Sequence, residues 1–303
     1  NRTITAIPPV LFSVQGGIGT AAEDQFLHHH YEIGTTGWGS PFLLVPEATT
    51  VDEETLQLLA ASNEEDVVLS RKSPLGVRFH YLKGTSADRE VKARIQQGRP
   101  GSPCTEKHLA FNTEFTKEPI CTASRKYQQL KTQQLKAANL PVEEFNRKME
   151  EIWDKDCLCI GLSNAASLVY DVPFVDKLKS VNICPGPNIA HFSKVVSLKT
   201  MVDHIYGRTD SLTHADRPHM FIAELDLYID YLKEKLEEEL LQGTLPKKAK
   251  YYNEFYMNLR KGIAYYQSLT DQIDDGAGNF QHLLSGAETE LDVLNYRYNL
   301  ANK

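Results

Sequence analysis

The hydrophobic pattern near the start of the chain predicts a buried strand followed by an amphipathic helix. Residues 10–14 read Val-Leu-Phe-Ser-Val, a nearly continuous apolar run that is typical of a strand covered on both faces of a parallel sheet. A helix is expected over residues 20–31. Thr20 and Glu23, three positions apart, form the capping box that marks a helix N-terminus.

The alternation of strand and helix continues to about residue 70. Residues 38–45 predict a second strand, residues 51–61 a second helix, and residues 66–70 a short third strand. Strands that alternate with helices usually run in the same direction, so we expect a parallel sheet. The sequence therefore predicts an α/β fold at this end of the chain.

Farther along, the pattern becomes helical. Helices are expected over residues 88–97, 123–138, 142–154, 157–170 and 195–206. The two clearest helices come later, because apolar residues recur three and four positions apart over residues 221–240 and 252–269. Gly243 and Pro246 mark the turn between them, so we expect an antiparallel hairpin, with residues 290–300 as a third helix.

The composition is that of an ordinary globular protein. Hydrophobic residues make up 41% and charged residues 24% of the 303 positions. No apolar run approaches the roughly 20 residues that a membrane span needs. The net charge of −7 argues against nucleic acid or an anionic membrane as a partner, because both select basic surfaces. Five cysteines without dense, regular spacing favour a reducing compartment, so a cytoplasmic location is expected.

Two glycine-bearing segments at predicted strand ends are the most informative motif. The first reads Gly-Gly-Ile-Gly-Thr at residues 16–20, and the second reads Gly-Trp-Gly-Ser-Pro-Phe at residues 37–42. Glycine lets backbone N–H groups approach an anion closely, and a helix start adds unpaired N–H groups and the positive end of its dipole. The pair predicts a phosphate-binding site; the alternative is that the glycines serve only as turns.

These segments, with Pro-Glu-Ala at residues 46–48, resemble the last two βα units of flavin barrels of the nitronate monooxygenase type. The closer resemblance is to the flavin-dependent enoyl reductase component of bacterial polyunsaturated fatty acid synthases, a branch of the same barrel family. That branch carries a helical C-terminal extension. Residues 145–153, residues 157–170 and the Cys-Pro-Gly-Pro turn at residues 184–187 are similar to it.

The resemblance implies the C-terminal βα units of a (β/α)8 barrel that binds FMN, followed by a largely α-helical extension. In such barrels the loops after strands seven and eight hold the phosphate. Carried over to this sequence, these loops would supply the backbone of Gly16, Gly17, Gly19, Gly39 and Ser40.

The resemblance also implies that the rest of the barrel lies outside this sequence. The N-terminal barrel portion would belong to the same precursor or to a partner chain, because a quarter of a barrel leaves open sheet edges. Within the sequence we expect barrel units over residues 1–85, a helical extension that covers the barrel mouth over residues 86–215, and a helical hairpin or bundle over residues 216–303. A homo-oligomer is compatible with this arrangement.

Two side chains are candidates for catalysis. Cys184 lies in a turn stiffened by prolines, which would hold it in an active-site roof, although the prolines could simply separate two helices. Glu47 follows a predicted strand end, where barrel enzymes place functional groups. Its other expected roles are to cap the next helix or to pair with Arg71 or Arg78.

The other cysteines give no clear metal motif. Cys157 and Cys159 lack the two-residue gap that is common in zinc and iron–sulfur sites, although Cys104 and Cys121 could join them in space. Three consecutive histidines at residues 28–30 point in different directions on a helix and cannot readily converge on one ion. Buried thiols and no metal are therefore expected.

The expected activity follows from the resemblance. It is FMN-dependent reduction of an activated C=C bond in an acyl thioester, free or bound to a carrier protein, with NAD(P)H as the hydride donor. Two alternatives stay open: a nitronate monooxygenase-type oxidase, and a non-catalytic helical interaction module of a synthase complex.

Overall fold

The computed structural model describes residues 10–275 and 278–302, and the chain divides into two compact units. Unit 1 contains the residues up to Trp38 together with those from Asp203 onward, and unit 2 contains residues 39–202. Unit 1 is therefore built from two segments that lie far apart in the sequence.

Unit 1 begins with a βαβ element, as the sequence predicts, although its second strand lies before the predicted range. Strand β1 (Ser13–Gln15) leads into helix α1 (Ala21–His30) and then strand β2 (Thr35–Gly37), and the two strands are parallel. The Thr20 side chain accepts a hydrogen bond from the Glu23 N–H, and the Glu23 side chain accepts one from the Thr20 N–H. The parallel pairing and the capping box are both confirmed.

The first strand is shorter and less buried than the sequence predicts. Val10, Leu11 and Phe12 lie before β1 and are 69%, 81% and 68% exposed, so they do not form a strand covered on both faces. The physical reason is that β1 has only one neighbour in the described structure, with Val14 paired opposite Thr36. A two-stranded sheet cannot bury a run of apolar residues on both faces.

The strand predicted over residues 38–45 is wrong. Its residues instead form a 3-10 helix, Ser40–Leu44, with Pro41 in its first turn. Proline has no N–H to give to a sheet and its φ angle suits the start of a helix, so this segment leaves the sheet after Gly37.

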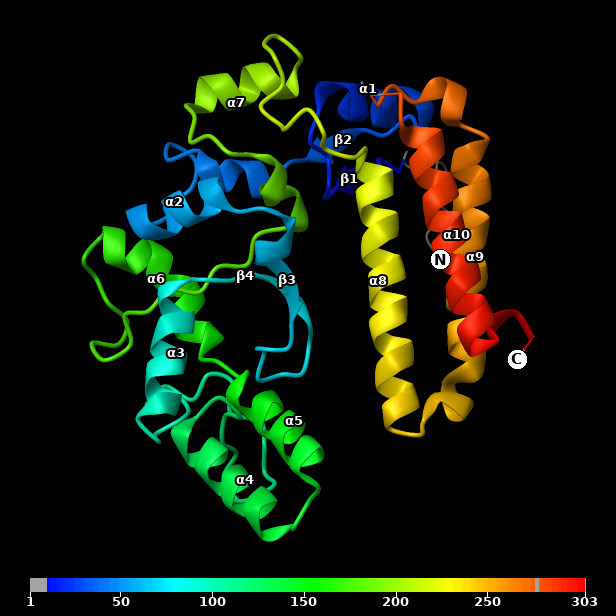
Figure 1. Cartoon of the computed structure of the whole chain (residues 1–303). Helices are drawn as coiled ribbons and strands as arrows, with labels where there is room; N and C mark the ends of the chain where they lie inside the picture. Colours follow the sequence, from blue (N-terminus) through cyan, green and yellow to red (C-terminus); the bar gives the residue numbers. More distant parts are fainter. Residues whose placement is uncertain (1–9, 276–277, 303) are drawn as a thin grey trace, which may run out of the picture. The chain divides into compact units, whose positions relative to one another are not determined.

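Three long helices form the rest of unit 1. Helices α8 (Met220–Leu241), α9 (Leu245–Gln267) and α10 (Phe280–Tyr298) pack against one another, and successive helices run in opposite directions (Figure 1). The turn between α8 and α9 contains Gly243 at a φ of 66°, a conformation that favours glycine. The predicted hairpin is confirmed, and the third helix is longer than residues 290–300.

One hydrophobic core joins the βαβ element to these helices. Ile18 and Leu27 from the N-terminal segment belong to the same buried cluster as Ile229, Leu284 and Leu291, which are fully buried in α8 and α10. Each such side chain contributes about 1.5–3 kcal/mol when buried. This core holds together the two distant segments of unit 1.

Unit 2 contains a second small sheet with a different topology. Strand β3 (Val67–Ser70) pairs with β4 (Phe79–Leu82) in the antiparallel sense. The third strand exists as predicted, but the prediction that it belongs to a parallel sheet is wrong. The chain turns back within eight residues, which permits a hairpin and is too short for a parallel crossover.

The other elements of unit 2 are helical. They are α2 (Glu53–Ala61), α3 (Ser86–Gln96), α4 (Arg125–Ala137), α5 (Val142–Trp153), α6 (Leu158–Val169), α7 (Leu198–Ile205, which continues into unit 1) and two further 3-10 helices, Glu64–Asp66 and Pro187–His191. Helices α4 and α5 lie side by side (Figure 1) and bury Leu135, Met149 and Ile152 between them. The six α-helices in this list lie close to their predicted ranges, whereas the two 3-10 helices were not predicted.

The fold is thus mixed α/β and 54% helical. The described residues contain four short strands in two separate sheets and form no closed barrel. None of their helices combines the length and the apolar character that crossing a membrane would require.

The shared core of unit 1 predicts a clear contrast within α10. Leu291→Ala removes a side chain that is fully buried and should lower the free energy of unfolding by about 2–5 kcal/mol, because a cavity replaces packed atoms. Val293→Ala, at a position that is 60% exposed on the same helix, should change it by less than about 0.5 kcal/mol. Denaturant unfolding measures both, and equal effects would contradict this core.

Candidate functional site

The first glycine segment forms a tight turn between β1 and α1. Gly16 and Gly17 have φ angles of 98° and 73°, which residues with a side chain rarely adopt. A Cβ atom added at Gly16 would meet no other atom within 4 Å, so the space beside this residue is open. The backbone of the turn is therefore accessible to a ligand.

The N–H groups that follow this turn already have an anionic partner within the chain. The Glu23 side chain is 2% exposed, and its Oε2 accepts hydrogen bonds from the N–H groups of Gly19 (2.7 Å) and Thr20 (3.2 Å). Its Oε1 accepts hydrogen bonds from Arg217 Nη1 and the Met220 N–H, both at 2.6 Å. Four donors fill the hydrogen-bonding capacity of a carboxylate.

Arg217 ties the turn to the beginning of the helical bundle. Besides its ion pair with Glu23, its Nη2 donates a hydrogen bond to the Gly17 carbonyl at 2.6 Å. A Cβ atom at Gly19 would lie 2.5 Å from the Arg217 guanidinium carbon. Gly19 is therefore required for the close approach of this arginine, and its N–H donates to the Glu23 carboxylate.

Two buried histidines lie beside this network in unit 1. His204 Nδ1 accepts a hydrogen bond from the Leu212 N–H (3.2 Å), so its Nε2 carries the proton and donates to the Gly19 carbonyl (3.0 Å). His219 Nδ1 accepts from the Phe221 N–H at 3.3 Å. Burial lowers the pKa of both imidazoles. Both rings are therefore neutral at pH 7.

Residues 39–42 of the second glycine segment belong to unit 2, where they meet the turn that contains Cys184. The Ser40 Oγ accepts a hydrogen bond from the Gly186 N–H at 3.0 Å, and the 3-10 helices that follow the two segments contact each other. A Cβ atom added at Gly39 would meet nothing within 4 Å. The structure therefore brings Ser40 next to the Cys184 turn, two features that lie far apart in the sequence.

Cys184 and Glu47 have different surroundings. Cys184 is an exposed residue, and desolvation of its thiol raises the pKa, so the thiol is protonated at neutral pH. Glu47 Oε2 accepts a hydrogen bond from the Leu198 N–H at 2.9 Å, so this carboxylate caps the start of α7. Capping was one of the roles expected for Glu47, although of a different helix.

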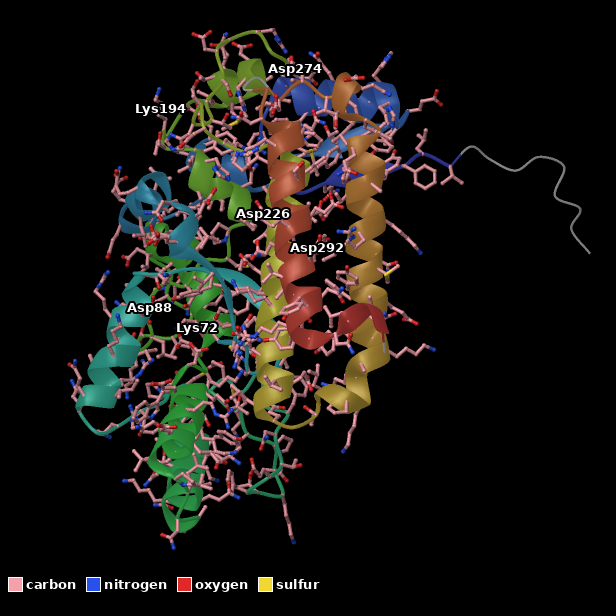
Figure 2. All side chains as sticks on the ribbon, turned by 45° about the vertical axis from the view of Figure 1, so that its right-hand side comes forward. Lys72, Asp88, Lys194, Asp226, Asp274 and Asp292 are labelled. Carbon is pink, nitrogen blue, oxygen red and sulfur yellow. The ribbon has the colours of Figure 1, made fainter. Side chains whose placement is uncertain are left out.

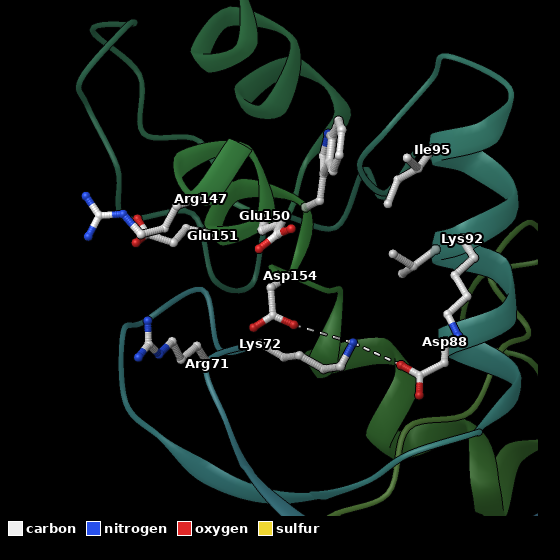
Figure 3. A pocket seen from close by; sticks show the side chains of 11 residues that line it. Arg71, Lys72, Asp88, Lys92, Ile95, Arg147, Glu150, Glu151 and Asp154 are labelled. Atoms are coloured by element: carbon white, nitrogen blue, oxygen red, sulfur yellow. Dashed lines mark ion pairs between the residues drawn. The ribbon is translucent and has the colours of Figure 1, made fainter. Parts of the chain in front are cut away.

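Unit 2 also contains a pocket of about 430 Å³ that the sequence analysis missed. Its lining comes from the segment after β3, from α3, and from α5 and the residue after it (Figure 3). Four basic side chains (Arg71, Lys72, Lys92 and Arg147) and four acidic ones (Asp88, Glu150, Glu151 and Asp154) line it, together with apolar side chains and Trp153. Its side chains suit ionic recognition of a polar ligand.

The Lys72 ammonium group lies among the acidic side chains of this pocket. It lies 3.0 Å from Asp88 Oδ1 and 3.9 Å from Asp154 Oδ1, as the dashed lines in Figure 3 mark, and 4.8 Å from the centre of the Tyr81 ring. Lys72 and Asp88 also lie close together in Figure 2. Tyr81 donates a hydrogen bond to Asp88 Oδ1 at 3.0 Å, and the Gly84 N–H donates to Oδ2 at 2.8 Å.

One sequence signal could have indicated this pocket. Thr85 and Asp88 stand at the spacing of Thr20 and Glu23, and Asp88 is the third residue of α3 in the same way. No periodicity, however, relates Asp88 to Lys72, because the two residues lie on different elements.

Comparison with known proteins adds no relative. No protein-family model, no curated protein and no solved structure matches this chain.

The buried ion pair predicts a large loss of stability when one partner is removed. Glu23→Gln leaves the Arg217 guanidinium buried, with its side chain 3% exposed, and without its anion. The free energy of unfolding should fall by about 3–5 kcal/mol. Glu254→Gln, at a side chain that is 62% exposed, is the matched control and should change stability by less than about 1 kcal/mol. Urea unfolding distinguishes the two, and a loss below 1 kcal/mol for Glu23→Gln would argue against the network.

The buried histidines predict a loss of stability in acid. Their folded pKa values lie below the ordinary value of 6.5, so the unfolded chain binds protons more readily as the pH falls below about 6.5. Their contribution is fully present above pH 6.5 and is lost as the pH falls toward the folded pKa values. His204→Gln should reduce the slope of stability against pH between 7.5 and 5.5, and the exposed His214→Gln should leave it unchanged. Denaturation midpoints measured across this range test the assignment.

Proposed function

We propose that this chain supplies the phosphate-binding turn and helical extension of an FMN-dependent oxidoreductase of the enoyl reductase type. The proposed reaction reduces an activated C=C bond of an acyl thioester with hydride from NAD(P)H. The remaining barrel units, on the same precursor or a partner chain, would hold the flavin ring. The flavin supplies the redox chemistry, and the protein positions the reactants and excludes water.

The observation that carries this proposal is the open turn between β1 and α1. A parallel βαβ element with two glycines at positive φ, and free space beside Gly16, lets backbone N–H groups approach a phosphate. The helix start itself offers fewer unpaired N–H groups to a phosphate, because Glu23 accepts hydrogen bonds from the N–H groups of Gly19 and Thr20. We therefore assign the FMN phosphate to the Gly16–Gly17 part of the turn. The contribution of Gly39 and Ser40 stays a prediction from sequence.

One observation favours a second candidate function. The Glu23 carboxylate already accepts hydrogen bonds from N–H groups near the helix start that a phosphate would otherwise use. The βαβ element could therefore have a purely structural role. The chain would then be a non-catalytic interaction module whose three long helices bind a synthase component.

Titration of FMN with the purified chain separates the two functions. Under the proposal, FMN fluorescence changes on binding, and Gly16→Ala weakens the affinity by about tenfold or more, because one or two hydrogen bonds to a charged phosphate are lost. Gly243→Ala is the matched control, since Gly243 has a comparable φ of 66° and open space around it. The Gly243→Ala substitution introduces the same backbone strain in unit 1, but away from the turn between β1 and α1.

Two results would contradict the flavin proposal. One is a folded chain that binds no FMN even when the remaining barrel units are supplied, which favours the interaction module. The other is an equal loss of affinity in Gly16→Ala and Gly243→Ala, which would show that strain rather than phosphate contact controls binding.

A further inference from the structure

Four of the five cysteines come together in unit 2, although they are spread over more than fifty positions of sequence. The segment around Ser102 pairs with the segment around Ser124 as a parallel bridge, with the Ser102 N–H donating to the Ala123 carbonyl at 2.8 Å. This pairing places the loop that contains Cys104 beside the loop that contains Cys121.

The third and fourth cysteines reach the same place from the start of α6. Ser102 and Cys157 line one small pocket, and the Cys157 thiol lies within hydrogen-bonding range of the Ser102 hydroxyl. It also lies within hydrogen-bonding range of the thiols of Cys104 and Cys159. We refer to Cys104, Cys121, Cys157 and Cys159 as the four-cysteine cluster. Cys184 is exposed and is not part of it.

The backbone around two of these sulfur atoms is arranged for a thiolate. N–H groups of Glu106 and Lys107, two and three residues after Cys104, point at the sulfur of that cysteine. N–H groups of Ala123 and Ser124 stand at the same offsets from Cys121 and point at its sulfur. Hydrogen bonds to the charged form favour ionisation. Two loops of unrelated sequence therefore share a geometry that stabilises negative sulfur.

One of these N–H groups belongs to a residue with an unfavourable backbone conformation. Lys107 has a φ of 58°, a left-handed conformation that is uncommon for residues with a side chain. Such backbone conformations concentrate at functional sites, where the surrounding structure enforces them. Lys107 supplies one of the two N–H groups that point at Cys104, so the unusual conformation serves the sulfur.

The charge of a four-thiolate cluster calls for a cation, because negative sulfur atoms this close together repel one another. The Cys159 sulfur accepts a hydrogen bond from the Cys157 thiol, so these two side chains are already in contact. The start of α6 adds the positive end of its dipole. A bound cation would displace the thiol protons. The N–H groups that already surround the sulfur atoms would then donate hydrogen bonds to thiolates.

We propose that Cys104, Cys121, Cys157 and Cys159 bind a single Zn²⁺ ion as four thiolate ligands. Zinc takes four sulfur ligands in a tetrahedron with Zn–S distances of about 2.3 Å, which places neighbouring sulfur atoms about 3.8 Å apart. Thiols within hydrogen-bonding range of one another, as Cys157 is with Cys104 and Cys159, match this spacing. An iron–sulfur cluster needs its ligand sulfurs farther apart, because the metal atoms and sulfides lie between them.

Binding requires small movements of side chains. Within the described residues, no three donors from Cys, His, Asp or Glu side chains already surround a common point as metal ligands. Rotation of a cysteine from one staggered position to the next moves its sulfur by about 3 Å. The proposal requires such rotations to close the tetrahedron, between loops that the main-chain pairing at Ser102 fixes beside each other.

Metal analysis of the intact chain tests the proposal. The protein, produced with zinc in the medium and purified without a metal-affinity resin, should contain about one zinc ion per chain. Replacing both Cys157 and Cys159 with alanine should lower the zinc content about tenfold or more, while Cys184→Ala, outside the cluster, should leave it unchanged. Circular dichroism establishes whether each variant is folded.

A second measurement avoids dependence on the folding of variants. Cobalt replacing zinc in the wild-type chain should give the sulfur-to-cobalt charge-transfer band and the intense visible bands of a tetrahedral thiolate site. A folded wild-type chain with five reactive thiols, no zinc and no such bands would overturn the proposal. Bound iron with inorganic sulfide, or a disulfide within the cluster, would also overturn the assignment of a single zinc ion.

Discussion

The buried carboxylate of Glu23 is the constraint on which unit 1 depends. Its four donors come from both sequence segments of the unit: two N–H groups from the βα turn, the guanidinium of Arg217 just before α8, and the N–H of Met220, the first residue of α8. A carboxylate that is 2% exposed is tolerable only because every lone pair has a donor. The hydrophobic core draws the two segments together, but it does not specify one register. The directional bonds to Glu23 fix where α8 begins relative to the turn.

The helices could be predicted from sequence because each carries a local signal. Periodic apolar residues and capping residues such as Thr20 and Glu23 act within a few positions, and the structure confirms them. The strands depend on pairing with distant residues, so their sequence signal is weaker. The apolar segment at residues 38–45 has strand composition, yet Pro41 lacks the N–H that a sheet requires, and a 3-10 helix forms. Nothing local indicates that residues 10–38 share a core with residues after 203.

The candidate sites were only partly predictable for the same reason. The glycine turn was visible in the sequence, because glycine is the residue that most readily adopts the positive φ found at Gly16 and Gly17. The partner of Glu23, which is Arg217, lies 194 residues away, and no spacing rule relates them. The cysteine spacing fits no common metal motif because the pairing of two irregular loops, rather than one continuous turn, brings Cys104 to Cys121.

Both units place a carboxylate at the start of a helix in the same way: Glu23, which is 2% exposed, in unit 1, and the partly buried Asp88, which is 13% exposed, in unit 2. Asp88, like Glu23, is the third residue of its helix, accepts a backbone N–H group at the helix start, and pairs with a cation from a distant element, Lys72. In both helices the carboxylate accepts N–H groups of residues just before the first helical residue, and it lies at the positive end of the helix dipole. An external phosphate therefore gains little at the start of α1 itself. Under the function proposed above, an external phosphate would take its donors from upstream of the helix, where the space beside Gly16 is open.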